Sequence, residues 1–588
     1  MIGPVFAREA TSAPKRTRTY IGRGVYLLAF LLLLCTGYLV LAETRGLTTT
    51  SQSARFGTWM FMLLAPLQLL VLSFNAAVGA TSSVALEKDR RTLILMLMTR
   101  LTGAEVVVGK LGASLLGVLS LLACTAPLFL ALTLFGGVSL TQVARVYLIT
   151  VSTVFTAASI GTVVALWREK TFQSIAVTVL TILLWLVLCE VAIVAGAAPN
   201  FVALISPPRA LAAASSPLVS GGVWIWYSVL VFAIGIAITL LGIAKVRIWN
   251  PSREVRMRPP EPETGEEAAQ AEAGDQHTDT TNWKVRKPRA VWDNPILWRE
   301  VCTWAYGRKV LLIRLAYLLV FAVIATSIYF QVQSGEAFER TGVGGRAMPS
   351  ATLPVAILGV ISLVMINALS VNSVTGERDG LALDLLMVTD LRPQEFVLGK
   401  LLGVLYVTKE MVLLPIALLV AMTVWQVINV EDLVYSILGW LVLSIFVTML
   451  GIHCGLNYPL SRSATLVSLG TVFFLCVGIA VCMVIMVSFR GAFEIQLAPF
   501  AVMILGGSAA LFAALGWQNP SRAIFVATAG LPLLTFFAIT QFLLQRDNLY
   551  VIFAITLVYG FAVAAMYIPA ISEFNVALEK NRSGPEDG

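Results

Sequence analysis

The segment from Glu87 to Gly112 reads EKDRRTLILMLMTRLTGAEVVVGKLG, and the segment from Glu377 to Leu402 reads ERDGLALDLLMVTDLRPQEFVLGKLL. Aligned without a gap, they are identical at eleven of 26 positions, where average residue usage would give about two or three matches. The identical pairs are Glu87/Glu377, Asp89/Asp379, Leu93/Leu383, Leu95/Leu385, Thr99/Thr389, Leu101/Leu391, Glu105/Glu395, Val107/Val397, Gly109/Gly399, Lys110/Lys400 and Leu111/Leu401. The chain therefore contains an internal duplication, and the duplicated piece is charged.

Long apolar runs surround both copies of this segment. Of the 588 residues, 58% are hydrophobic and only 13% are charged, whereas a soluble domain carries roughly 25% charged residues. The composition predicts an all-α polytopic membrane protein. The formal net charge of +8 is explained by Lys and Arg on cytoplasmic flanks, so it does not indicate a nucleic-acid partner.

The apolar runs predict two tandem repeats of about six spans each, since a span needs about 20 apolar residues. Six runs precede the linker and up to eight follow it, which gives 12–14 spans. The first-half runs are 24–43, 57–80, 112–136, 142–167, 172–196 and 222–247. The second-half runs are 310–330, 353–375, 402–425, 432–457, 464–488, 497–517, 522–544 and 549–572. The run 497–517, with Gly506 and Gly507, leaves two alternatives, a span or a re-entrant or broken helix.

A polar stretch separates the two repeats. The first repeat covers 1–249, the stretch 250–293 is expected to be a disordered cytoplasmic linker without a core, and the second repeat covers 294–588. Basic residues gather in the N-terminal tail and in the loops after the second and fourth spans, which predicts that these lie in the cytoplasm. We expect a multi-pass protein of the cell's inner (plasma) membrane, with the lipid bilayer as a partner.

The duplicated loop predicts three features. Thr92–Met98 is too short to span and should form an amphipathic helix at the membrane surface. Thr102 and Glu105 have capping-box spacing, and Pro393 takes the first-turn position in the second copy. Lys110 and Lys400 should snorkel to the inner interface. An ordinary charged loop remains an alternative, but acids that recur in both copies favour a docking surface.

The duplication extends to the start of each half. Pro4-Val-Phe-Ala-Arg8-Glu9 matches Pro295-Ile-Leu-Trp-Arg299-Glu300, and each precedes the first span of its half. Trp298 lies beside the charged pair, a mixture suited to a helix in the membrane interface.

These motifs resemble the permeases of ABC-2-type ABC transporters, in the sodium- and multidrug-exporter branch. The resemblance implies that the loop after the second span carries a coupling helix, which docks on a separate ATP-binding subunit, and that the N-terminal segment is an elbow helix. It implies ATPase-coupling loops at Glu87, Asp89, Thr99, Glu105, Lys110, Glu377, Asp379, Thr389, Glu395 and Lys400, and elbow residues Arg8, Glu9, Arg299 and Glu300. Family permeases are usually single six-span units that dimerise, whereas both units are fused here.

No ATP site is expected within the chain. The nearest approach to a P-loop, Gly103 to Lys110, is one residue too long, and Leu111 replaces the hydroxyl residue. ATP should therefore act through the partner, two copies of which are expected. We expect no catalytic residue and no bound cofactor, and with two histidines and no CxxC pair we expect no metal site.

Polar residues within spans are costly and often functional. Those that could line a translocation path are Glu190, Lys409, Glu410, Asn75 and Asn367. The alternative is hydrogen bonding or ion pairing between helices.

The sequence thus predicts the permease subunit of an ATP-driven exporter. An ion-gradient-driven secondary transporter and a non-transporting membrane scaffold remain alternatives. An intramembrane enzyme is disfavoured, because the spans supply no paired nucleophile and base. The transported substrate does not follow from the sequence.

Overall fold

The computed structural model describes residues 3–12, 17–45, 49–168, 171–194, 204–216, 222–250, 292–302, 309–338, 340–343, 346–380, 382–387, 391–489, 493–518, 520–545 and 548–582. The fold is that of an all-α polytopic membrane protein, as predicted. Among the described residues, eleven helices are long and apolar enough to cross a membrane, or twelve if one bent pair counts as a span. The predicted linker lies outside the described residues.

In the described part of the first half, six helices are long and three are short. The short helices are α1 (Pro4–Ser12), α4 (Thr92–Met98) and α9 (Pro207–Ser215). The long helices are α2 (Thr17–Arg45), α3 (Thr50–Asp89), α5 (Gly103–Leu134), α6 (Leu140–Trp167), α7 (Thr171–Val194) and α10 (Val223–Trp249). Each predicted span of this half corresponds to one long helix.

The second half repeats this order with additions. It begins with α12 (Pro295–Cys302), α13 (Lys309–Ser334) and the 3-10 turn η2 (Glu336–Phe338). A short antiparallel hairpin, β1 (Arg340–Val343) and β2 (Arg346–Pro349), follows. The remaining elements are α14 (Thr352–Asp379), α15 (Ala382–Met387), α16 (Pro393–Val407), α17 (Lys409–Val424), α18 (Val430–Asn457), α19 (Ser461–Phe489), α20 (Phe493–Leu515), α21 (Arg522–Thr540), the π-turn η3 (Gln541–Gln545) and α22 (Asn548–Arg582).

Helix ends follow the capping chemistry of the sequence. The backbone N–H of Thr102 donates to Glu105 Oε2 at 2.8 Å, and the N–H of Glu105 donates back to Thr102 Oγ1 at 3.2 Å. This confirms the predicted capping box of α5. Ser139 and Gln142 form the same motif at the start of α6. Glu395 accepts from the N–H of Arg392 at 3.3 Å, and Pro393 stands in the first turn of α16, as predicted.

The third span differs between the halves. In the first half α5 is continuous, whereas in the second half α16 and α17 meet at Thr408 with a bend of 55°. A bend frees a backbone carbonyl, which must find a partner in the membrane. Arg314 Nη2 donates to the carbonyl oxygen of Val407 at 2.6 Å and supplies that partner.

The last helix, α22, takes the place of a sixth span. It packs against α18 and α16, as α10 packs against α6 and α5. The extra apolar runs of the second half are therefore α20 and α21, inserted before the sixth helix, and they do not extend the end of the chain. Helix α20 is continuous through Gly506 and Gly507, which excludes the alternative of a broken helix. In the first half the same position between α7 and α10 holds the short helix α9.

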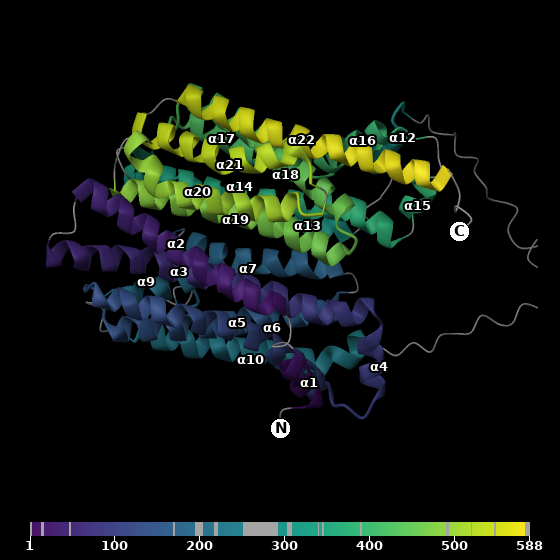
Figure 1. Ribbon diagram of the computed structural model, residues 1–588, viewed down its shortest axis with the longest axis horizontal. Coiled ribbons are helices and arrows are strands. Elements are labelled where there is room, and N and C mark those ends of the chain that lie inside the picture. Colours follow the sequence, from purple (N-terminus) through teal and green to yellow (C-terminus); the bar gives the residue numbers. More distant parts are fainter. Residues whose placement is uncertain are drawn as a thin grey trace, which may run out of the picture.

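The two halves lie side by side (Figure 1). Helices α2, α3 and α7 of the first half contact α13, α14, α19 and α20 of the second. The rings of Phe74 and Phe473 stack across this boundary with centroids 4.3 Å apart. Helices α4, α12 and α15 lie toward the right of Figure 1, at what we call the charged end, and α9 lies at the far end.

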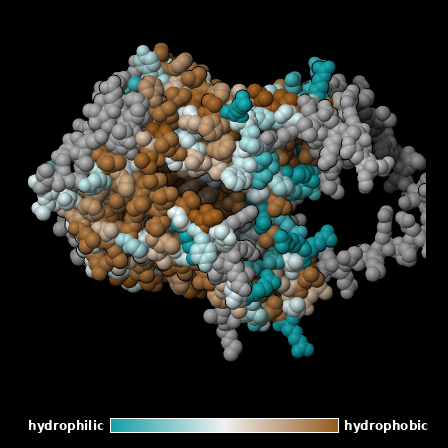
Figure 2. Space-filling model, viewed as in Figure 1, coloured by the Kyte–Doolittle hydropathy of each residue, from teal (hydrophilic) through white to brown (hydrophobic). Residues whose placement is uncertain are grey.

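The surface follows this division. Figure 2 shows hydrophilic residues gathered at the charged end, while hydrophobic residues cover the middle of the face in view. Outward apolar side chains are expected where lipid is the solvent, since no hydrophobic penalty attends their exposure to acyl chains.

Candidate functional site

The recurring charges of the first half form one cluster beneath α4. Lys110 Nζ, from the start of α5, donates to Glu9 Oε1 at 2.9 Å and to Glu87 Oε1 at 2.8 Å. Glu9 belongs to α1, and Glu87 lies near the end of α3. Arg8 approaches Glu87 to 3.8 Å. We call these four residues the first cluster, and it joins three helices that are distant in sequence.

The second half contains the equivalent arrangement. Lys400 Nζ donates to Glu300 Oε1 at 2.5 Å, to Glu377 Oε1 at 2.6 Å and to the carbonyl of Ser373 at 2.9 Å. Arg299 also pairs with Glu377. We call Arg299, Glu300, Glu377 and Lys400 the second cluster. It joins α12, α14 and α16 as the first cluster joins α1, α3 and α5.

These clusters correct one expectation. The lysines do not snorkel to the interface, because the side chains of Lys110 and Lys400 are only 5% and 1% exposed. The carboxylates of Glu87 and Glu377 bind within the chain. Buried charges tolerate the loss of water only when each has a close counter-charge, so the recurrence of all four residues follows from their mutual dependence.

The glycine before each lysine allows the elbow helix to approach. A Cβ at Gly109 would lie 3.1 Å from Val5 Cβ, and a Cβ at Gly399 would lie 2.8 Å from Asn294 Oδ1 and 2.9 Å from Ile296 Cβ. The repeated Gly-Lys pair therefore has one physical role in both halves. The glycine gives space for the elbow helix, and the lysine bonds to it.

The residue after each recurring glutamate binds the end of the fourth span. Lys88 Nζ donates to the carbonyls of Leu166 at 2.5 Å and Arg168 at 2.9 Å. Arg378 Nη1 donates to the carbonyls of Gly455 at 3.0 Å and Tyr458 at 2.7 Å. Cations favour helix C-termini, whose last carbonyls lack partners within the helix.

The recurring aspartate binds the start of the fifth span. Thr171 Oγ1 donates to Asp89 Oδ2 at 2.5 Å, and Ser461 Oγ donates to Asp379 Oδ1 at 2.6 Å. The three successive residues Glu-[Lys/Arg]-Asp thus reach three different regions of the same half. These contacts were not predicted from the sequence. The feature that could have indicated them is that the middle residue is a cation in both copies, Lys88 and Arg378.

Helix α4 presents an apolar face away from the bundle. Leu93 is 2% exposed and anchors the helix, whereas Leu95 is 63% and Met98 is 70% exposed. Ile94 is also exposed, at 36%. Leu383 of α15 is buried like its counterpart Leu93. The expected short helix is therefore present, but residues 93–98 are all apolar, so its exposed face is apolar like its buried one.

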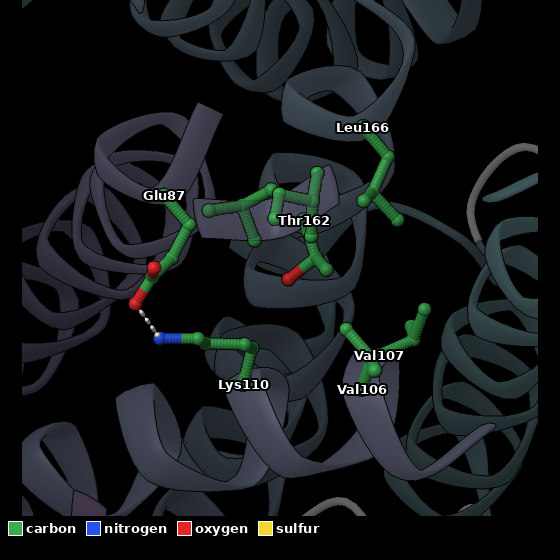
Figure 3. A pocket seen from close by; sticks show the side chains of 8 residues that line it. Glu87, Val106, Val107, Lys110, Thr162 and Leu166 are labelled. Atoms are coloured by element: carbon green, nitrogen blue, oxygen red, sulfur yellow. Dashed lines mark hydrogen bonds and ion pairs between the residues drawn. The ribbon is translucent and has the colours of Figure 1, made fainter. Parts of the chain in front are cut away.

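Helix α4 is connected to the first cluster. The hydroxyl of Thr92, its first residue, donates to the carboxylate of Glu87. Glu87 and Lys110 lie at one side of a small pocket beneath the helix, and Val106, Val107, Thr162 and Leu166 line the rest in view (Figure 3). The pKa of Glu9 lies below its ordinary value, because its bonds to Lys110 and Arg8 outweigh the burial that raises it.

The recurring threonine, Thr99 and Thr389, is the last of the predicted loop residues. Thr99 ends α4 and donates from Oγ1 to the carbonyl of Met96 at 2.6 Å. Its counterpart Thr389 lies outside the described residues.

Most of the polar residues expected to line a path make contacts within the bundle. Asn367 is fully buried and donates to Ser468 Oγ at 2.7 Å. Glu190 pairs with Arg209, at the start of α9, at 3.3 Å. Glu410 pairs with Arg314 at 3.5 Å, and the amine of Lys409 lies 4.8 Å from the Tyr406 ring. The side chain of Asn75 is exposed.

Across the part of the chain that the structure describes, no three His, Cys, Asp or Glu side chains gather as a metal site. No family model and no curated protein matches the chain.

Proposed function

We propose that this chain is the membrane-spanning permease subunit of an ATP-driven ABC exporter, with both halves of the permease fused. Two separate ATP-binding subunits bind at the charged end, one below α4 and one below α15. ATP hydrolysis takes place in those subunits, and this chain supplies the path through the bilayer.

The observation that carries the proposal is the geometry of α4. Leu95 and Met98 are both exposed on α4, at the charged end of the molecule. Neighbouring exposed apolar side chains mark interaction sites, so this face is expected to bind a partner rather than to contact water. A short helix that inserts an apolar face into a groove is a common mode of recognition. A partner bound there would push on a helix that Thr92 connects to the first cluster.

The clusters supply the route by which such a push moves a whole half. Each cluster joins the elbow helix to the second and third spans, and the neighbouring cation and aspartate add the fourth and fifth. Packed, hydrogen-bonded elements respond as units. Motion at α4 would thus displace five helices together.

The orientation belongs to the same proposal. Arg90, Arg91 and Arg100 stand at the charged end, and basic loops stay in the cytoplasm. The charged end therefore faces the cytoplasm of a cell bounded by the plasma membrane, and the β1–β2 hairpin faces outward.

The contacts of the charged residues within the spans favour this proposal over an ion-gradient carrier. Such a carrier needs titratable groups that can leave their partners within the protein and bind the transported ion instead. Glu190 and Glu410 are each held by an arginine, and the charges shared by both halves lie at the charged end.

The test uses the full chain purified in lipid nanodiscs with its ATP-binding subunit. Leu95→Asp with Met98→Asp should abolish binding of that subunit while the melting temperature stays unchanged, because both side chains are exposed. Leu134→Asp, at an 88% exposed position on the far end of α5, is the matched control and should leave binding intact. A chain that binds no nucleotide-hydrolysing subunit, or binds it equally well after the double substitution, refutes the proposal.

A further inference from the structure

The exposed surface of α4 has a cationic rim that its duplicate lacks. Arg90, Arg91 and Arg100 flank the helix, and all three are exposed. The aligned residues of the second copy are Gly380, Leu381 and Asp390. At the exposed position Ile94, the second copy has Asp384.

The two loops therefore differ in the sign of their charge. Residues 88–102 contain four basic residues and one acid, whereas residues 378–392 contain two basic residues and three acids. In each loop one cation and one aspartate make contacts inside the bundle. They are Lys88 and Asp89 in the first loop, and Arg378 and Asp379 in the second. The other charges of the two loops are three arginines in the first sequence, against two aspartates and one arginine in the second.

Opposite charges at equivalent positions are incompatible with identical docking grooves. A groove with an acidic rim would attract the arginines around α4 and repel Asp384, and a basic rim would do the reverse. Arg91 holds a left-handed backbone conformation, with φ at +56°. Residues other than Gly, Asn and Asp adopt it rarely, so an arginine there carries a local conformational cost.

We propose that the two loops bind two different ATP-binding subunits, and that the one on α4 has an apolar groove rimmed by acidic residues. This inference rests on the proposed function and refines it. Two copies of one subunit would be compatible with the proposed function, but one docking groove could not complement the opposite charges of the two loops. The permease would thus bind two different ATP-binding subunits, each complementary to one of the two different loops.

Site-specific photo-cross-linking of the full chain tests this. A benzoylphenylalanine is placed at Leu95 in one protein and at the aligned Leu385 in another, each made in the cells that produce the natural complex. The cross-linked partner is identified by peptide mass spectrometry. We expect two different P-loop proteins, and we expect the peptide bound at Leu95 to be rich in Asp and Glu.

A charge variant sharpens the result. Arg90→Glu with Arg100→Glu should lower the yield at Leu95 roughly tenfold, from two rim charges each reversed at up to about 1 kcal/mol. The yield at Leu385 should not change. These arginines are exposed, and the melting temperature confirms that the variant folds.

Each other outcome decides against the inference. One P-loop protein at both positions overturns it and leaves the proposed function standing. Cross-links from Leu95 to lipid alone, or to a second copy of this chain, overturn it as well. A P-loop protein at neither position refutes the proposed function and this inference together.

Discussion

The two charge clusters have the same residues in the same connections, yet they differ in burial. In the second cluster the side chains of Lys400 and Glu300 are both 1% exposed. In the first, Lys110 is 5% exposed but its partner Glu9 is 26% exposed. Duplication preserved the chemistry of the contact, and the surrounding packing then set how much each half depends on it. The second half should be the more tightly locked and the first the more adjustable.

The largest expected effect comes from removing the central lysines. Lys400→Met removes the buried ammonium that Glu300 and Glu377 share and leaves them only the partly exposed Arg299, so it should destabilise the second half by about 3–5 kcal/mol. Lys110→Met should cost less, about 1–3 kcal/mol, since Glu9 can reach solvent. Thermal unfolding in nanodiscs measures both.

A double substitution checks the reason. Glu300→Gln with Lys400→Met removes one of the stranded charges and should recover part of the lost stability. Equal losses for the two lysine variants would break the comparison between the clusters.

The bent third span gives the next effect. Arg314→Ala leaves the Val407 carbonyl without its partner and should destabilise the protein by about 1–3 kcal/mol. Arg23 holds a similar position in α2, but its third span, α5, is unbroken. Arg23→Ala should therefore lower the melting temperature less. Two equal shifts would show that the bend does not depend on Arg314.

Substitution of the glycines beside the elbow helices should affect the stability of the two halves differently, by a smaller amount. Gly399→Ala brings a Cβ to 2.8 Å from Asn294 Oδ1, and Gly109→Ala brings one to 3.1 Å from Val5 Cβ. Alanine also favours a helix by about 1 kcal/mol over glycine. We expect Gly399→Ala to destabilise by about 1–2 kcal/mol net and Gly109→Ala to be near neutral. Hydrogen exchange of α12 and α1 measures the loosening of each elbow helix, and greater loosening of α1 would contradict this order.

The smallest effect depends on pH and involves the open first cluster. The folded pKa of Glu9 is depressed, so its contribution is present above its ordinary pKa of 4.5 and is lost as the pH falls through the folded pKa. The side chain is partly open, so the contribution should be no more than about 1 kcal/mol. The melting temperature of Glu9→Gln should approach that of the natural chain as the pH falls from about 5 to about 3. A constant difference over that range would contradict the assignment.

Sequence patterns predicted the elements well, because span length and capping are local. The duplication, the long helices and the Thr102–Glu105 cap could all be read from short windows. The continuity of α20 could not, because Gly506 and Gly507 weaken a helix that packing against α21 and α2 supports. The place of α22 as the sixth helix of its half also depends on packing between distant elements.

The candidate site shows the same limit more clearly. The sequence identified Glu87, Glu377 and both lysines as recurring, but it could not show whether they face a partner or each other. Lys110 and Glu9 lie 101 positions apart, and only the folded bundle brings them together. Recurrence identifies residues under a shared constraint. The three-dimensional contacts pair these charges with one another, whereas the apolar face of α4 stays exposed.

The most direct test compares one buried charge with the exposed apolar face in the same binding assay. The affinity of the ATP-binding subunit and the melting temperature are measured for Glu87→Gln and for Leu95→Asp with Met98→Asp. The account predicts that Glu87→Gln lowers the melting temperature and leaves the Kd of the subunit unchanged, while the apolar double variant weakens binding at an unchanged melting temperature. A Glu87→Gln protein of normal stability that no longer binds the subunit would contradict it.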